Sequence, residues 1–106
     1  PAVAEHAGDL AALLRVDDGA PADARGHAAR LLGGLGDSIA AACIGDLSRA
    51  LADPVGRVRA AAANALCELG AEVCADHADE LADLVRDADF GARVAGVVAL
   101  GQAAKA

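Results

Sequence analysis

Aromatic side chains are almost absent from this sequence of 106 residues: Phe90 is the only one, and tryptophan, tyrosine and methionine do not occur. A core must therefore be built from leucine, valine, isoleucine and alanine, through many small contacts at roughly 25 cal/mol per Å² of buried apolar surface. Surfaces that bind nucleic acid are basic, whereas this chain carries a net charge of −7. We therefore expect no nucleic-acid partner.

Long apolar runs are missing as well. No run of roughly 18 apolar residues occurs, so we expect no membrane span. The start of the chain, PAVAEHAGDL, lacks the basic and apolar segments of a signal peptide. We predict a cytoplasmic location.

Cysteine and hydroxyl side chains are few. Cys43, Cys67 and Cys74 follow no recognised metal-binding spacing, and their odd count argues against a disulfide framework. Ser38 and Ser48 are the only hydroxyl side chains, and neither lies in a nucleophile elbow. We therefore predict no catalytic residue, no metal and no cofactor.

Lysine is nearly absent too. Lys105 stands against eight arginines, and aspartate outnumbers glutamate by 12 to 4. Abundant alanine, glycine and arginine are typical of high-GC coding, whereas abundant aspartate with a single lysine is typical of haloarchaeal proteins. The composition leaves both origins open.

The most informative stretch is LADPVGRVRAAAANALCELG, residues 51–70. Asp53 suits a helix N-cap, and Pro54 suits the first helical position, where no N–H is needed. Gly70 suits the residue that follows a helix. Between them, apolar residues recur at helical spacing, namely Val58, Ala61, Ala62, Ala65, Leu66 and Leu69. The stretch therefore predicts a turn followed by one complete helix.

The same pattern recurs along the whole chain with a period of about 34 residues, within the range of about 20–50 that indicates a solenoid of stacked repeats. A shift by one period superimposes three arginines and two sets of leucines: Arg25, Arg59 and Arg93; Leu32, Leu66 and Leu100; Leu13, Leu47 and Leu81. We predict a single domain, 1–106, with repeats at about 3–36, 37–70 and 71–104.

Each repeat is expected to hold two helices. We predict the first helix of each pair at 3–16, 38–51 and 72–86, and the second at 21–35, 54–69 and 90–104. No stretch alternates for long enough to indicate a strand. Four glycines fall inside these helices, where we expect them to permit close helix approach: Gly8, Gly26, Gly45 and Gly96.

The pattern D-P-x-x-x-V-R-x-x-A-x-x-A-L-x-x-L-G resembles the HEAT-repeat family, and its period is most similar to the HEAT-like branch of phycobilin lyases and many prokaryotic proteins. The middle repeat carries the match through Asp53, Pro54, Val58, Arg59, Ala62, Ala65, Leu66, Leu69 and Gly70. The third repeat has Ala88 where the pattern has proline, and the first has Gly19 where it has aspartate. The resemblance implies an all-α fold, a right-handed α-solenoid of three two-helix repeats.

The resemblance also implies where the charges lie. In HEAT-like stacks the second helices line the inner, concave layer and the first helices line the outer one. Here the second helices carry five positive and two negative side chains, and the first helices carry three positive and nine negative. We therefore expect a mildly basic inner layer and an acidic outer layer.

Arg25, Arg59 and Arg93 form the most regular polar series, which we call the arginine ladder. The resemblance implies that each arginine pairs with a turn aspartate, and Asp53 and Asp87 stand six residues before Arg59 and Arg93. The alternative is that the ladder binds carboxylates or phosphates on the concave face, since guanidinium groups grip both.

Polar residues that break the repeat are better candidates for contact with a partner. On the inner layer we predict partner binding by Arg30, Arg57, Arg59, Asn64 and Glu68. The last helix is the other candidate, because Arg93 is its only charged residue and terminal repeats usually carry a polar outer face. We expect Val94, Val97 and Val98 to meet a partner protein, a second copy in a homodimer, or further repeats.

Together these patterns predict a non-catalytic scaffold or adaptor that binds another protein, rather than an enzyme. Two alternatives remain open, because a fold does not define a function. One is an accessory subunit of a lyase-like or other enzyme complex, which the resemblance suggests and the scarcity of aromatic side chains disfavours. The other is a structural fragment of a longer or engineered repeat protein.

Overall fold

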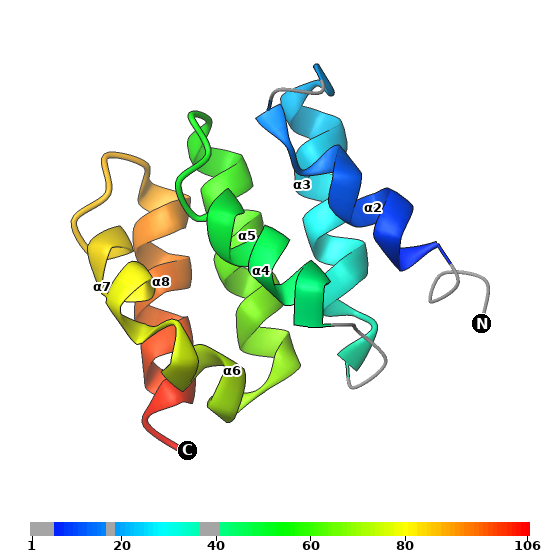
Figure 1. The fold of residues 1–106 in the computed structure, drawn as a ribbon. Helices are drawn as coiled ribbons and strands as arrows, with labels where there is room; N and C mark the ends of the chain where they lie inside the picture. The colour runs from blue at the N-terminus through cyan, green and yellow to red at the C-terminus, as the bar shows by residue number, and fades with distance from the viewer. Residues whose placement is uncertain (1–5, 17–18, 37–40) are drawn as a thin grey trace.

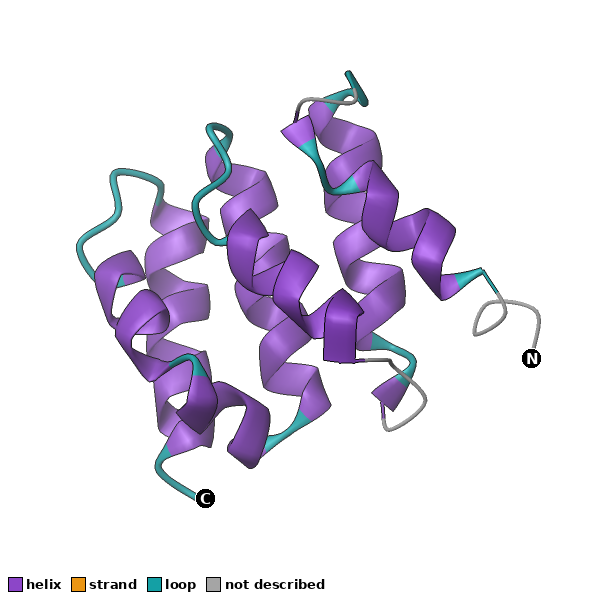
Figure 2. Ribbon diagram, viewed as in Figure 1, coloured by secondary structure: helices purple, strands orange, loops and turns teal. Residues whose placement is uncertain are grey.

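The computed structural model describes residues 6–16, 19–36 and 41–106. Within these ranges all regular structure is helical (Figure 2), which confirms the all-α prediction. None of the helices found there has the length and apolarity needed to cross a bilayer. The helices are α2 (Ala7–Leu13), α3 (Ala22–Gly33), α4 (Ala41–Ala50), α5 (Gly56–Leu69), α6 (Ala71–Asp76), α7 (Ala78–Leu84) and α8 (Phe90–Ala103).

The helices form two layers (Figure 1). Helices α3, α5 and α8 lie side by side in one layer, for which we keep the name inner layer, and α5 contacts both of its neighbours. Helices α2, α4 and the α6–α7 pair cover them in the second layer. The loops that lead into α3, α5 and α8 all lie at the same end of the molecule, so residues in successive loops come close together.

The core is assembled from leucine and alanine, as the scarcity of aromatic residues predicts. The largest fully buried side chains are Leu32, Leu47, Leu66, Leu81, Val58 and Cys74. Alanines such as Ala29, Ala62 and Ala63 fill the space between adjacent helices and are completely buried. Because alanine is short, the helices of the inner layer pack closely along their length.

Two predicted helix boundaries are wrong. The helix expected at 72–86 is broken at His77, whose backbone (φ −117°, ψ 24°) leaves the helical conformation and separates α6 from α7. Helix α5 begins at Gly56 rather than at Pro54, with Val55 in the N-cap position. Asp53 is not the N-cap, because its carboxylate accepts the N–H of Val55 in the preceding loop instead, at 2.9 Å.

Other predicted boundaries agree within a few residues where they can be compared. Helices α3 and α8 match the helices expected at 21–35 and 90–104. Gly70 follows α5 with φ +114°, a conformation that glycine adopts far more readily than other residues. The predicted starts of the helices at 3–16 and 38–51 lie outside the described residues.

Glycine permits close helix approach at two places, of which only one was predicted. A Cβ on Gly96 would lie 2.8 Å from the Cβ of Leu84, and one on Gly33 would lie 2.7 Å from the Cα of Ala65. In contrast, a Cβ on Gly8 or Gly26 would meet nothing within 4 Å, and one on Gly45 would meet only the end of an arginine side chain. The explanation of close packing therefore fails for those three glycines.

Two alanine substitutions on α3 test this distinction. Gly33→Ala should lower the free energy of unfolding by about 1–3 kcal/mol, because the added methyl group meets backbone of α5 and forces two helices apart. Gly26→Ala should raise it by about 0.5–1 kcal/mol, because alanine is the better helix former and the space is open. Urea unfolding followed by circular dichroism measures both, and equal effects of the two substitutions would contradict the packing described here.

Candidate functional site

The first element of the candidate site is a buried ion pair between α3 and the loop before α5. Arg25 donates from Nε to Oδ2 of Asp53 at 2.8 Å and from Nη2 to Oδ1 at 3.1 Å. Its third nitrogen, Nη1, donates to the carbonyl of Ala20 at 2.5 Å. The side chains are only 8% and 1% exposed, so this bidentate pair is shielded from water.

The same arrangement recurs one helix pair further along. Arg59 on α5 donates from Nε and Nη2 to the two carboxylate oxygens of Asp87, at 2.7 and 2.8 Å. Its Nη1 donates to the carbonyl of Asp53 at 2.7 Å. Arg59 therefore joins the loop before its own helix to the loop before α8.

This geometry corrects the pairing that the family resemblance implies. The carboxylates of Asp53 and Asp87 bind the arginines that stand 28 residues earlier, not the arginines six residues later. The later arginine binds a backbone carbonyl instead: that of Asp53 for Arg59, and that of Asp87 for Arg93. Arg25 and Arg59 thus each bind two loops, and each of their carboxylate pairs spans neighbouring helices of the inner layer.

Arg93 differs from the other members of the arginine ladder. Its Nη1 donates to the carbonyls of Asp87 and Ala88, at 2.8 and 3.2 Å. Its guanidinium carbon lies 5.6 Å from the ring centroid of Phe90, which places a cation over an aromatic face. Among residues 6–16, 19–36 and 41–106, it forms no salt bridge with a carboxylate.

The ladder pairs shift the pKa values of Asp87, Arg59 and Arg25. Hydrogen bonds from Arg59, and then from the backbone N–H of Asp89, lower the pKa of Asp87 below its usual value. Hydrogen bonding to Asp87 raises the pKa of Arg59, and hydrogen bonding to Asp53 raises that of Arg25, both against the effect of burial. These groups consequently stay charged at neutral pH.

The structure places the predicted partner-binding residues of the inner layer in three different settings. Arg30 lies 2.7 Å from Nδ1 of His27, and Arg57 pairs with Asp23 at 3.0 Å. These side chains border a shallow hollow of about 120 Å³ between α3 and α5. Asn64 and Glu68 are exposed on α5 outside that hollow, and Arg59 is held in the ladder.

The valines predicted on the last helix do face outward. Val94, Val97 and Val98 are exposed on α8, and Val85 at the end of α7 is exposed beside them. Together with Arg93 they line an open, mainly apolar hollow of about 360 Å³. The structure thus brings the three predicted valines together, and adds Val85.

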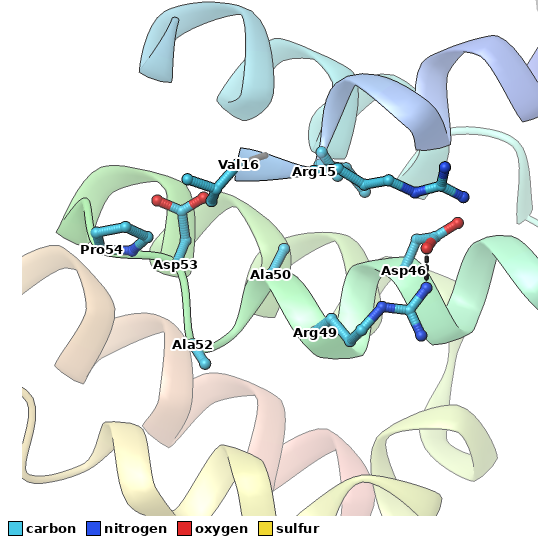
Figure 3. Close-up of a pocket in the computed structure, with 9 residues that line it drawn as sticks. Arg15, Val16, Asp46, Arg49, Ala50, Ala52, Asp53 and Pro54 are labelled. Carbon is cyan, nitrogen blue, oxygen red and sulfur yellow. Dashed lines mark hydrogen bonds and ion pairs between the residues drawn. The ribbon is translucent and has the colours of Figure 1, made fainter. Parts of the chain in front are cut away.

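A further hollow, of about 300 Å³, was not predicted from the sequence (Figure 3). It lies between the end of α2 and α4, and Arg15, Asp46 and Arg49 border it. Asp46 is buried and forms an ion pair with Arg49, three residues later on the same helix. That spacing is the only sequence signal for this pair, and many exposed helical pairs share it.

The cysteines are packing residues in the described part of the chain. Cys43 and Cys74 are buried, and the thiol of Cys74 donates to the carbonyl of Leu66 at 3.2 Å. Burial, and then the nearby Cys67, raise the pKa of the Cys74 thiol to about 11. Across residues 6–16, 19–36 and 41–106, no group of three or more histidine, cysteine, aspartate and glutamate side chains is placed to hold a metal ion.

The chain matches no family model and no curated protein. The described side chains form an ion-paired polar hollow on the inner layer and an apolar face on α8.

Neutralising one buried carboxylate tests the ladder. Asp53→Asn keeps the shape of the side chain but leaves the buried guanidinium of Arg25 without its counter-charge. The free energy of unfolding should fall by roughly 3–5 kcal/mol, or the variant should fail to fold. The matched control, Asp79→Asn on the exposed surface of α7, should change it by no more than about 0.5 kcal/mol. Similar values for the two variants in urea unfolding would contradict the structural role.

The lowered pKa of Asp87 predicts a particular dependence on pH. The folded state binds the proton more weakly than the unfolded state, so the pair with Arg59 stabilises fully above about pH 4, the unfolded pKa. This stabilisation is lost as the pH falls through the lower, folded pKa. Thermal unfolding of wild type and Asp87→Asn should therefore differ most at neutral pH and converge in acid. A difference that stays constant or widens below the unfolded pKa would contradict the assignment.

Proposed function

We propose that the chain is a non-catalytic protein–protein interaction scaffold, built as a right-handed solenoid of three HEAT-like repeats and working in the cytoplasm. Equivalent roles at positions one sequence period apart support the repeat assignment. Arg25 and Arg59 each bind the aspartate of the following loop, and Leu32 and Leu66 are both fully buried. On this view, the arginine ladder is structural and the surface beside it binds the partner.

The observation that carries the proposal is the contrast between engaged and available polar groups on the inner layer. Arg25 and Arg59 use their donors on loops and buried carboxylates, so they fix the shape of the layer. Arg57, Asn64 and Glu68 are exposed on the same layer and do not take part in the ladder. Rigid helices that present exposed, non-repeating polar side chains are suited to recognising one partner surface.

The local pairs on this surface do not prevent such recognition. Arg57 and Asp23 are about two-thirds and four-fifths exposed, at 64% and 79%. An exposed ion pair is worth only about 0–1 kcal/mol. A carboxylate on a partner protein can therefore replace Asp23 at little cost. Arg59 supports the same surface indirectly, because its hydrogen bonds to Asp87 hold the loop before α8.

The second contact is the exposed face of α8. Val94, Val97 and Val98 place apolar surface in water on the outermost helix of the inner layer. Covering that surface is favourable at roughly 25 cal/mol per Å². We propose that it adds binding energy beside the polar inner surface.

A double variant on the inner layer tests the proposal. Arg57→Glu with Asn64→Ala should reduce capture of partner proteins by the immobilised chain at least tenfold, because it reverses one charge and removes one amide. The melting temperature should change little, since both side chains are exposed. Quantitative mass spectrometry of the captured proteins measures the loss.

The matched control reverses charge on the other layer. Asp79→Lys with Glu80→Gln alters two exposed residues of α7 and should leave the captured proteins unchanged. Capture that survives the inner-layer variant, or that falls equally with the control, would contradict binding through the inner layer.

A further inference from the structure

Equivalent positions, one sequence period apart, differ in exposure in a way that depends on their neighbours. Ala29 and Ala63 are completely buried, whereas Val97 at the same position of the last helix is 56% exposed. Helix α3 has α5 beside it and α5 has α8, but α8 is the outermost helix of the layer (Figure 1). This position is therefore covered wherever another helix pair follows.

At the opposite end of the layer, a position that is buried in the later helices is exposed in the first. Leu31 on α3 is 49% exposed, whereas Ala65 and Ala99 at the same position are 1% and 0% exposed. Ala65 faces back toward α3, since its Cα would lie 2.7 Å from a Cβ on Gly33. Leu13 on α2 follows the same rule: it is exposed, while its equivalents Leu47 and Leu81 are fully buried.

Both ends of the layer thus carry apolar side chains at positions that the interior buries. The eight large hydrophobic residues exposed in the described ranges all lie in or beside the first or the last helix pair. Five of them stand at positions that are buried elsewhere in the chain: Leu13, Val16, Leu31, Val85 and Val97. The two end faces correspond to the two faces that pack against each other in the interior, although their side chains are larger.

Arg93 differs from the equivalent arginines in its hydrogen bonds. Arg25 and Arg59 each bind a carboxylate of the next loop, and Arg93 has no salt bridge among the described residues. Two of its three guanidinium nitrogens have no hydrogen bond there, since only Nη1 donates. The last helix therefore presents both an apolar face and a guanidinium group suited to an acidic loop.

We propose that a second copy of this chain docks head to tail on α8, with its Leu13 and Leu31 packed against Val85, Val94 and Val97. The inference rests on the proposed function and names the occupant of its second contact. In this arrangement Nε and Nη2 of Arg93, which donate no hydrogen bond among the described residues, lie at the contact with the second copy.

One residue makes this contact differ from the interior contacts. Phe90 stands at the position of Gly56, where a Cβ would lie only 2.5 Å from the Cβ of Asp89. The exposed Phe90 ring therefore stands where the loop of a second copy would approach, so that loop must lie further from α8 than Asp89 lies from Gly56. The valines and leucines are also longer than the interior alanines, so the helices that meet here stand further apart.

A head-to-tail contact uses two different faces and leaves one of each free, so it generates open chains or rings instead of closing as a two-fold dimer. Light scattering on the chain should show a mass that rises with concentration and passes beyond that of a dimer. A mass that stays at the monomer value over the whole range, or that stops at the dimer, would overturn the proposal.

Two single-face variants make the test specific. Val97→Glu places a charge on the α8 face and Leu31→Glu places one on the α3 face. Each variant therefore keeps only one functional face and should remain monomeric on its own. An equimolar mixture should form a dimer and nothing larger, because it contains one productive pair of faces. Assembly of Leu31→Glu on its own would show a two-fold contact through α8, and a mixture that stays monomeric would exclude the head-to-tail contact. Both results would overturn the proposal.

Gln102→Glu is the matched control. Gln102 lies on the same helix but outside the apolar face, and its equivalents Gly34 and Glu68 stay exposed. This variant should assemble like wild type, whereas a loss equal to that of Val97→Glu would show that any added negative charge on α8 prevents assembly and would overturn the assigned register. Circular dichroism confirms that each variant is folded. The capture assay with the inner-layer variant is separate, so either proposal can fail while the other stands.

Discussion

Arginine side chains that reach from one helix pair into the loop of the next set the geometry of this molecule. A core of alanine and leucine buries apolar surface but does not by itself fix the relative positions of the helices, because contacts between apolar side chains are non-directional. The bidentate pairs of Arg25 with Asp53 and of Arg59 with Asp87 are directional and shielded, so each fixes where one helix stands relative to the next. Removing one partner of the Arg25–Asp53 pair leaves an uncompensated buried charge, which is strongly destabilising.

The sequence could predict what depends on local spacing. Helical periodicity located α3, α5 and α8, and leucines that recur at the sequence period are fully buried at Leu32, Leu47, Leu66 and Leu81. It could not predict which carboxylate each arginine binds. Asp53 lies near Arg59 along the chain, yet the folded helix pair brings Arg25 to its carboxylate. Distance along the chain carries no information about how neighbouring helix pairs stack, and the break at His77 gives no sign in the apolar pattern.

The candidate site was only partly predictable for a related reason. Departure from the repeat identifies Arg30, Arg57, Asn64 and Glu68 as residues that the fold does not require, and all four are exposed. It does not reveal that Arg30 contacts His27 or that Arg57 contacts Asp23, because these partners lie on the helix turn below or on the neighbouring helix. Such exposed pairs are weak, so they orient the side chains without withdrawing them from a partner. Arg59, which the sequence prediction also included although it repeats with Arg25 and Arg93, is instead held by Asp87.

The contrast between interior and end positions has a physical explanation that connects stability with binding. Inside the layer, Ala63 and Ala65 allow close helix contact, and a ladder pair fixes that contact. At the ends, Val97 and Leu31 occupy equivalent positions with larger side chains. Larger side chains bury more apolar surface when covered, but they hold helices further apart, where a guanidinium group reaches a facing carboxylate less easily. An end-to-end contact is therefore driven by apolar burial with less directional control than the interior contacts. A contact with more apolar burial but fewer directional hydrogen bonds favours reversible association between two chains over the permanent packing found within a single chain.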